Sequence, residues 1–152
     1  MNVNEIMQQA VATCAPKDNL AGAAKLMRAH KCGFLPVVDS HGAVAGVMTD
    51  RDACLAASET HRAMTRIFVE EAMSHPVFSC FPDEHVKAAL ATMSKHHVRR
   101  LPVLDKQGHL QGVLSIDDVV QASQRRGSPS AEDIVEALRG IGAPRHIEGV
   151  LA

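Results

Sequence analysis

The chain has 152 residues, enough for one compact domain or for two small halves that share a core. Hydrophobic residues make up 46% of it, yet there are four Phe and no Trp or Tyr, so aliphatic and thioether side chains must fill the core. Charges nearly cancel at a formal net charge of −1, which argues against a basic protein that binds nucleic acid or an acidic membrane surface.

The first half of the chain predicts a strand, a helix, a hairpin of two strands and a second helix, in that order. Pro16 ends the first strand, and Asp18 or Asn19 can cap the first helix. Two apolar runs around Ser-His-Gly are too short for helices and predict the hairpin. Thr49 then provides the N-cap of the closing helix. The expected ranges are 11–16, 19–30, 34–39, 43–48 and 49–57.

The second half predicts the same order of elements, with Ser115 as the N-cap of its closing helix. Residues 59–70 are polar and mixed, as expected of a linker between a first repeat at 5–58 and a second at 71–123. The tail at 124–152 lies outside the repeat, and its middle part predicts a short helix. The expected ranges within the second repeat are 77–82, 83–97, 100–105, 110–115 and 116–123.

The two halves match each other without a gap. The matched residues lie 66 positions apart, as Met7 does from Met73. An ungapped repeat of this length indicates one supersecondary unit used twice, and two such units can face each other across a pseudo-twofold axis. A cleft between them is a natural place for a ligand. Further matched pairs are Pro16 with Pro82, 35–37 with 101–103, Gly46 with Gly112, and Asp52 with Asp118.

A longer motif also occurs twice, as FLPVVDSHGAVAGVMTDRD and RLPVLDKQGHLQGVLSIDD. This pattern resembles the tandem CBS (cystathionine-β-synthase) domain, whose paired form is called a Bateman module, over about residues 5–123. The resemblance implies an α+β fold in which two tandem β-α-β-β-α repeats pack sheet to sheet as a pseudo-twofold intramolecular pair. It also implies that two chains pair through their helices into a flat homodimer.

The same resemblance implies a regulatory module that binds an adenosine-containing ligand and is not an enzyme. AMP, ADP or ATP is the expected ligand, NAD and S-adenosylmethionine are alternatives, and no cofactor is expected to be required. The residues themselves agree with binding without catalysis. The sequence holds neither a P-loop nor a G-x-G-x-x-G motif, and no nucleophile in a recognisable catalytic context.

The repeated [Ser/Thr]-x-x-Asp motif carries the expected ligand contacts. In the family the Asp accepts hydrogen bonds from the ribose hydroxyls, and the Ser or Thr helps to hold phosphate. On this sequence the ribose residues are Asp52 and Asp118, and the phosphate residues are Thr49 and Ser115. A carboxylate can accept from both vicinal hydroxyls, and a helix N-terminus offers unpaired N–H groups to an anion. The alternative is that each pair is only a capping box.

The two repeats differ in the positive charge that phosphate needs. Arg99 and Arg100 precede a strand of the second repeat and resemble the basic phosphate contacts of adenylate-sensing members of the family, whereas Gly33 and Phe34 stand at the equivalent positions of the first. Neighbouring residues on a strand point to opposite faces, so at most one arginine is expected to face a given site. Arg51 could add a further cation, or be a solvated helix residue.

The adenine pocket is expected to be apolar. Val11, Val77 and Ile116 are the expected lining residues, with a plain core role as the alternative for each. Asp50 replaces Ile116 in the first repeat, which also lacks the arginine pair. The second site is therefore expected to be the better one.

The histidines and cysteines give weaker signals. None of the nine His and four Cys has the spacing of a zinc site, so no metal site is expected. Cys14 and Cys80 are repeat mates on equivalent strands, which could place them near the symmetry axis, and small buried thiols are preferred over redox sensing. The absence of a C-x-x-C motif, of a signal-like start and of a long apolar run favours a cytoplasmic protein with free thiols and no membrane contact.

A second class of function stays open beside the nucleotide sensor. The module could have empty sites and act by dimerisation or by docking to an enzyme or a transporter. The tail at 124–152 could then be a docking helix or a strap across its own dimer.

Overall fold

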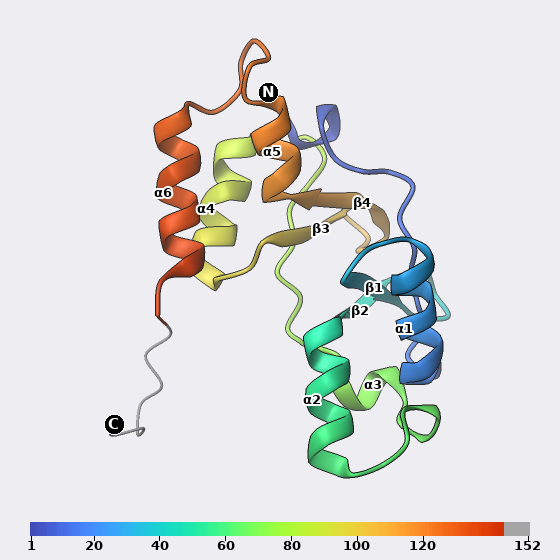
Figure 1. Ribbon diagram of the computed structural model, residues 1–152. Helices are drawn as coiled ribbons and strands as arrows, with labels where there is room; N and C mark the ends of the chain where they lie inside the picture. Colours follow the sequence, from blue (N-terminus) through green and yellow to red (C-terminus); the bar gives the residue numbers. More distant parts are fainter. Residues whose placement is uncertain (145–152) are drawn as a thin grey trace.

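Two small antiparallel sheets lie side by side in the middle of the molecule, one from each half of the chain (Figure 1). In the first sheet β1 (Phe34–Val38) pairs with β2 (Val44–Thr49). In the second, β3 (Arg100–Leu104) pairs with β4 (Leu110–Ser115). The register shifts at the same point of both ladders. Both predicted hairpins are confirmed. The computed structural model describes residues 1–144.

Helices cover the sheets on their outer sides (Figure 1). Their predicted caps are present, because Asn19 Oδ1 accepts from the backbone N–H of Gly22 and both Thr49 and Ser115 form capping boxes. One start differs from the prediction. The chain turns at Phe81–Glu84, where the Glu84 carboxylate accepts from the Phe81 N–H, so the fourth helix begins at Val86 and not at residue 83. The helices are α1 (Leu20–Ala29), α2 (Asp50–Thr60), α3 (Val69–Ala72), α4 (Val86–His96), α5 (Ile116–Ala122) and α6 (Ala131–Gly142), with 3-10 turns η1 (Val3–Glu5) and η2 (Met64–Arg66).

The strand expected at the start of each repeat is only a single parallel bridge, Cys14 to Val37 in the first repeat and Cys80 to Val103 in the second. Cys14 donates its N–H to Pro36 O (3.1 Å) and accepts from Val38 N (2.8 Å). The next rungs would need N–H groups of Pro36 on one side and Pro16 on the other, and proline has none. Pro82 and Pro102 stop the second ladder in the same way. The α+β fold class is confirmed, but each leading strand is reduced to a single bridge.

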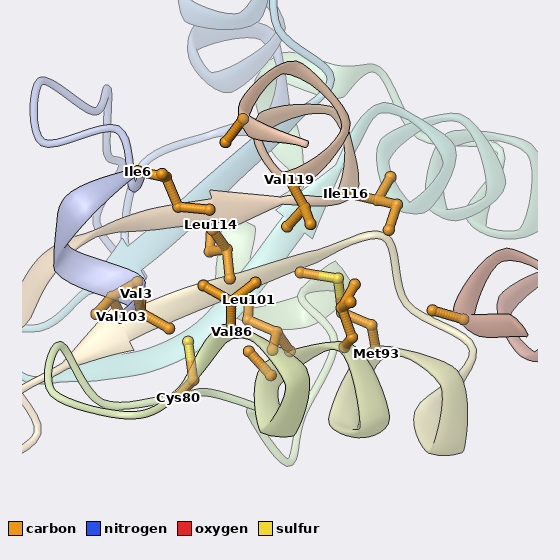
Figure 2. Close-up of a cluster of buried hydrophobic side chains, with 14 of the residues drawn as sticks. Val3, Ile6, Cys80, Val86, Met93, Leu101, Val103, Leu114, Ile116 and Val119 are labelled. Carbon is orange, nitrogen blue, oxygen red and sulfur yellow. The ribbon is translucent and has the colours of Figure 1, made fainter. Parts of the chain in front are cut away.

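Each repeat has its own hydrophobic core, and the chain crosses between them. Val3 and Ile6, from the start of the chain, are buried in the core of the second repeat, where Figure 2 shows them beside Val103 and Leu114. Ile67 and the first residue of α3 are buried in the core of the first repeat. The segment that leads each sequence copy therefore packs against the other copy.

Glycine makes this crossed packing possible. Met7 and Met73 are the repeated methionines, and each lies against the repeated glycine of the opposite copy. A Cβ on Gly112 would lie 2.6 Å from Gln8 O, and a Cβ on Gly46 would lie 2.6 Å from Met73 Sδ. The methionine pair and the glycine pair matched in the sequence thus contact each other, once as Met7 on Gly112 and once as Met73 on Gly46.

The tail helix α6 distinguishes the second repeat from the first, because it lies along α4 (Figure 1). Ile134 and Ala137 are buried. Lys87 Nζ lies 2.9 Å from Asp133 Oδ2, and this contact together with bonds from Ser130 lowers the pKa of Asp133 to about 2. The predicted short helix of the tail is confirmed, and residues 145–152 of the tail lie outside the described part. No helix within residues 1–144 is long and apolar enough to cross a bilayer.

Candidate functional site

The two motif aspartates sit in the first turns of α2 and α5, where each uses one carboxylate oxygen to close a capping box. Asp118 Oδ2 accepts from the backbone N–H of Ser115 (2.8 Å) and from its hydroxyl (2.5 Å). Asp52 Oδ2 accepts from the N–H (3.0 Å) and the hydroxyl (2.8 Å) of Thr49. Both [Ser/Thr]-x-x-Asp motifs therefore do form capping boxes. It fixes the orientation of each carboxylate and leaves the other oxygen, Oδ1, outside the cap.

The second oxygen of each aspartate meets the segment that crosses over from the other copy. Gln8 Nε2 donates to Asp118 Oδ1 at 2.9 Å, and Ser74 Oγ donates to Asp52 Oδ1 at 3.3 Å. Gln8 and Ser74 are repeat mates, each directly after a repeated methionine. Sequence reasoning missed both residues. Their place next to Met7 and Met73 is the available signal, but the sequence does not say that they cross.

Arg100, and not Arg99, shares a sheet face with the cap of α5. Arg100 pairs directly with Ser115 in the ladder, and both alternate with Leu101 and Leu114, which point into the core. Arg99 is exposed, lies 3.9 Å from an oxygen of Asp117, and contributes its backbone carbonyl to the N–H at the start of α5. Arg99 lies one residue before β3 begins, so the expected alternation of two strand residues stays a prediction.

The same position in the first repeat is apolar and is flanked by negative charge. Phe34 pairs with Thr49 where Arg100 pairs with Ser115. The Asp50 carboxylate lies against Gly33, just before β1, so closely that a Cβ on Gly33 would be only 2.7 Å from Asp50 Oδ2. Arg51 is exposed next to it. The first site thus combines the same capped carboxylate with a different electrostatic environment.

The expected adenine-lining residues are placed unequally. Ile116 is fully buried in the second core, which agrees with its alternative as a plain core residue. Val11 and Val77 are half-buried on the chain segments that follow Gln8 and Ser74. Two cavities, of about 450 and 350 Å³, lie elsewhere, and none of the expected site residues lines them. The first lies beside Phe81 and Lys106, and the second lies between α4 and α6.

The buried cysteines lie in separate cores. Burial raises the pKa of the Cys14 thiol to about 11 and that of the Cys80 thiol to about 12, with a smaller contribution from Asp18 and Glu84 respectively. Both thiols therefore stay protonated near neutral pH and are poor nucleophiles. No group of three or more His, Cys, Asp or Glu side chains in the described chain is arranged to hold a metal ion.

Comparisons with known proteins agree on one family. The family model described as CBS domain matches residues 3–59 and 69–125. The CBS domain-containing protein YhcV of Bacillus subtilis is 35% identical over 118 residues, which cover 78% of this chain and 82% of that protein. The chain also matches homoserine O-acetyltransferase of Methanococcoides burtonii at 31% identity over 78% of its own length, but spans only 23% of that enzyme.

Two similar solved structures contain adenosine compounds. The CBS domain pair of protein MJ0100, in complex with 5′-methylthioadenosine and S-adenosyl-L-methionine, has a TM-score of 0.72 and 26% identity, over 80% of this chain and 94% of that chain. CBSX2 in complex with AMP has a TM-score of 0.70 and 26% identity over the same shares. The matches thus include most of one protein and a minor part of a longer enzyme.

Proposed function

Because the chain belongs to the CBS domain family, whose members are commonly regulatory and include pairs that bind adenosine compounds, we propose that it binds AMP, ADP or ATP and signals by a change of shape or partner. The observation that carries this proposal is the carboxylate of Asp118. Its Oδ2 is held by the helix cap, and its Oδ1 is directed at the crossing segment. NAD and S-adenosylmethionine remain alternative ligands with the same ribose.

The capped carboxylate suits a ribose for a geometric reason. A carboxylate can accept about four hydrogen bonds, and the cap fixes the plane of the group without using Oδ1. A vicinal diol presents two O–H donors, and the two lone pairs of Oδ1 can accept both. Asp52 has the same arrangement, so both repeats keep the ribose function in this proposal.

The phosphate function favours the second repeat. The hydroxyls of Ser115 and Thr49 already donate to their own aspartates, so these residues orient the carboxylates and leave the negative charge of phosphate to a cation. Arg100 supplies it on the same face of the sheet as Ser115, and a guanidinium can bind phosphate with two parallel hydrogen bonds. Phe34 cannot do this in the first repeat. We therefore assign phosphate binding to Arg100, with Arg99 and Arg51 as outer contributors.

The crossed chain also changes which valine serves which site. Val11 follows Gln8 by three residues, and Gln8 contacts Asp118. Val77 follows Ser74 in the same way, and Ser74 contacts Asp52. We assign Val11 to the adenine of the Asp118 site and Val77 to that of the Asp52 site.

Titration calorimetry with AMP, ATP, NAD and S-adenosylmethionine tests the proposal, with Asp118→Asn and Asp52→Asn as a matched pair. Both substitutions make the same change at equivalent helix caps, so effects of the cap itself cancel in the comparison. We expect Asp118→Asn to weaken AMP binding at least tenfold, because it removes a charged acceptor, and Asp52→Asn to weaken it less. Unchanged affinity in Asp118→Asn would overturn the site, and no binding of any ligand to the unaltered protein would overturn the nucleotide proposal.

Assembly and location remain predictions. The homodimer through the helices, an enzyme or transporter as the regulated partner, and the cytoplasm as the compartment follow from the resemblance and the composition. A module with empty sites that acts by docking is the outcome favoured if no adenosine compound binds.

A further inference from the structure

We propose that Gln8 is an internal competitor for the ligand carboxylate, so that binding at Asp118 displaces the Gln8 side chain and alters the connection between the two repeats. This inference rests on the proposed function, since it concerns the same carboxylate. Gln8 thereby gains a role in ligand binding. Its displacement also gives a bound ligand a way to change how the two repeats are connected.

Gln8 and a ribose compete because the Asp118 carboxylate has too few free acceptor sites for both. Oδ2 already accepts two hydrogen bonds, from the N–H and the hydroxyl of Ser115. Oδ1 accepts one, from Gln8 Nε2. A carboxylate oxygen has two acceptor sites, so a single site is left, whereas the two hydroxyls of a ribose need two. One existing donor must therefore leave when both hydroxyls bind.

Gln8 is the donor that can leave at the lower cost. The two bonds from Ser115 are local bonds of the capping box, and their loss would open the start of α5. The Gln8 side chain is exposed, is long, and makes one bond to a residue 110 positions away. Its amide can exchange Asp118 for water without opening a helix.

The backbone at Gln8 stays in place while the side chain moves. Gln8 N and O both pair with Val113, at 2.9 Å each, and Met7 packs on Gly112. Beyond this point the described chain makes no backbone hydrogen bond from residue 9 to residue 13, until Cys14 bonds to β1. The Gln8 side chain thus makes the last hydrogen bond to the second repeat before the connector at residues 9–13, whose Ala12 already packs against the core of the first repeat.

The first repeat has a weaker version of the same device. Ser74 Oγ reaches Asp52 Oδ1 at 3.3 Å, and Asp52 Oδ2 is capped by the same two groups of Thr49. A serine hydroxyl at this distance contributes a weaker bond than the glutamine amide at 2.9 Å. Displacement should therefore matter more for ligand affinity in the second repeat than in the first.

Gln8→Ala tests the competition, with Gln9→Ala as a matched control because Gln9 is the exposed neighbour of the same type. Titration calorimetry with AMP should show about fivefold to tenfold tighter binding to Gln8→Ala, the worth of about one net hydrogen bond. Gln9→Ala should bind like the unaltered protein, and Ser74→Ala should differ from it by less than about twofold.

A spectroscopic readout follows the side chain itself. In ¹⁵N-labelled protein the Gln8 side-chain NH₂ signals, identified by their loss in Gln8→Ala, should shift when AMP is added. The same signals should already be shifted in Asp118→Asn without AMP, where the charged acceptor is gone. Static Gln8 signals during an AMP titration that saturates would overturn the displacement.

The outcomes separate this inference from the proposed function. AMP binding to the unaltered protein with equal or weaker binding to Gln8→Ala overturns the competition alone. Binding to Gln8→Ala but not to the unaltered protein supports both ideas, and no binding to either protein overturns both.

Discussion

The first and second repeats share the pairing and register of their hairpins and differ in the chemistry around their aspartates. Both keep the capped carboxylate, the bridged leading segment and the glycine that admits the crossing chain. Arg100 in the second repeat stands where Phe34 stands in the first. Duplication has kept the residues that build the scaffold and has changed the residues that would select a charged ligand, so equal folds need not mean equal sites.

The comparison also extends to what covers each repeat. In the second repeat α6 lies along α4, held by the Lys87–Asp133 contact and by the close approach of Gly140 to Ser94. In the first repeat α1, the repeat mate of α4, contacts the linker turn η2 and α2 instead. The two outer faces are therefore unlike, although the helices beneath them are repeat mates.

The largest expected effect concerns the glycines at the crossing. Gly112→Ala would place a Cβ 2.6 Å from the backbone oxygen of Gln8, which cannot move without breaking the bridge to Val113. Gly46→Ala would meet mainly the flexible end of Met73, because the nearest backbone oxygen, that of Ser74, would lie 3.2 Å away. We expect the free energy of unfolding to fall by about 2–3 kcal/mol for Gly112→Ala and by about 1 kcal/mol for Gly46→Ala. Urea denaturation measures both, and equal losses would mean that the two crossings are equally tolerant.

The next effect concerns the charge that separates the sites. Arg100→Phe gives the second repeat the residue of the first, and we expect AMP affinity to fall about tenfold because a charged hydrogen-bond donor is lost. Adenosine, which lacks the phosphate, should bind Arg100→Phe and the unaltered protein alike. Arg99→Ala serves as the neighbouring control and should lose less, since Arg99 is exposed and lies beside Asp117. Calorimetry at one fixed ionic strength measures all of these, and a parallel loss for adenosine would place Arg100 outside the phosphate contact.

The smallest expected effect compares the two buried thiols. The pKa is about 11 for Cys14 and about 12 for Cys80, above the ordinary value of 9.0, so above pH 9 the unfolded chain loses protons that the folded chain keeps. The free energy of unfolding should therefore decrease as the pH rises from 9 towards 11. Cys80→Ala should flatten this decrease more than Cys14→Ala does. Urea denaturation at a series of pH values checks the order, and a steeper decrease in either variant would contradict it.

Much of the local structure could be predicted from the sequence. The hairpins at residues 34–49 and 100–115 were predicted because short β-branched runs flank a turn, and the caps at Thr49 and Ser115 because hydroxyls satisfy the first N–H groups of a helix. The leading strands were overpredicted. Their own residues favour extended backbone, but the prolines that interrupt the ladder include Pro36 and Pro102 on the partner strands, which local pattern reading does not compare.

The candidate site could be predicted only in part. The aspartates follow from the repeated motif, whereas the arginine pair occurs only in the second copy and is predicted from its resemblance to the family's phosphate contacts. Gln8 and Ser74 were missed, because nothing near them in the sequence marks a contact 110 or 22 positions away.

The sequence by itself determined that one unit occurs twice, where its hairpins and helices lie, and that the two copies differ in charge. These properties depend on periodicity, caps and turns, which act over a few residues. Only the tertiary structure decided that Met7 packs on Gly112 and Met73 on Gly46, and that each aspartate therefore meets the chain of the other copy. A repeat shows which positions are equivalent, but equivalent positions give the same pattern whether a segment packs on its own copy or on its neighbour. The choice between them is made by long-range burial of apolar side chains such as Val3 and Ile67, which no local pattern encodes.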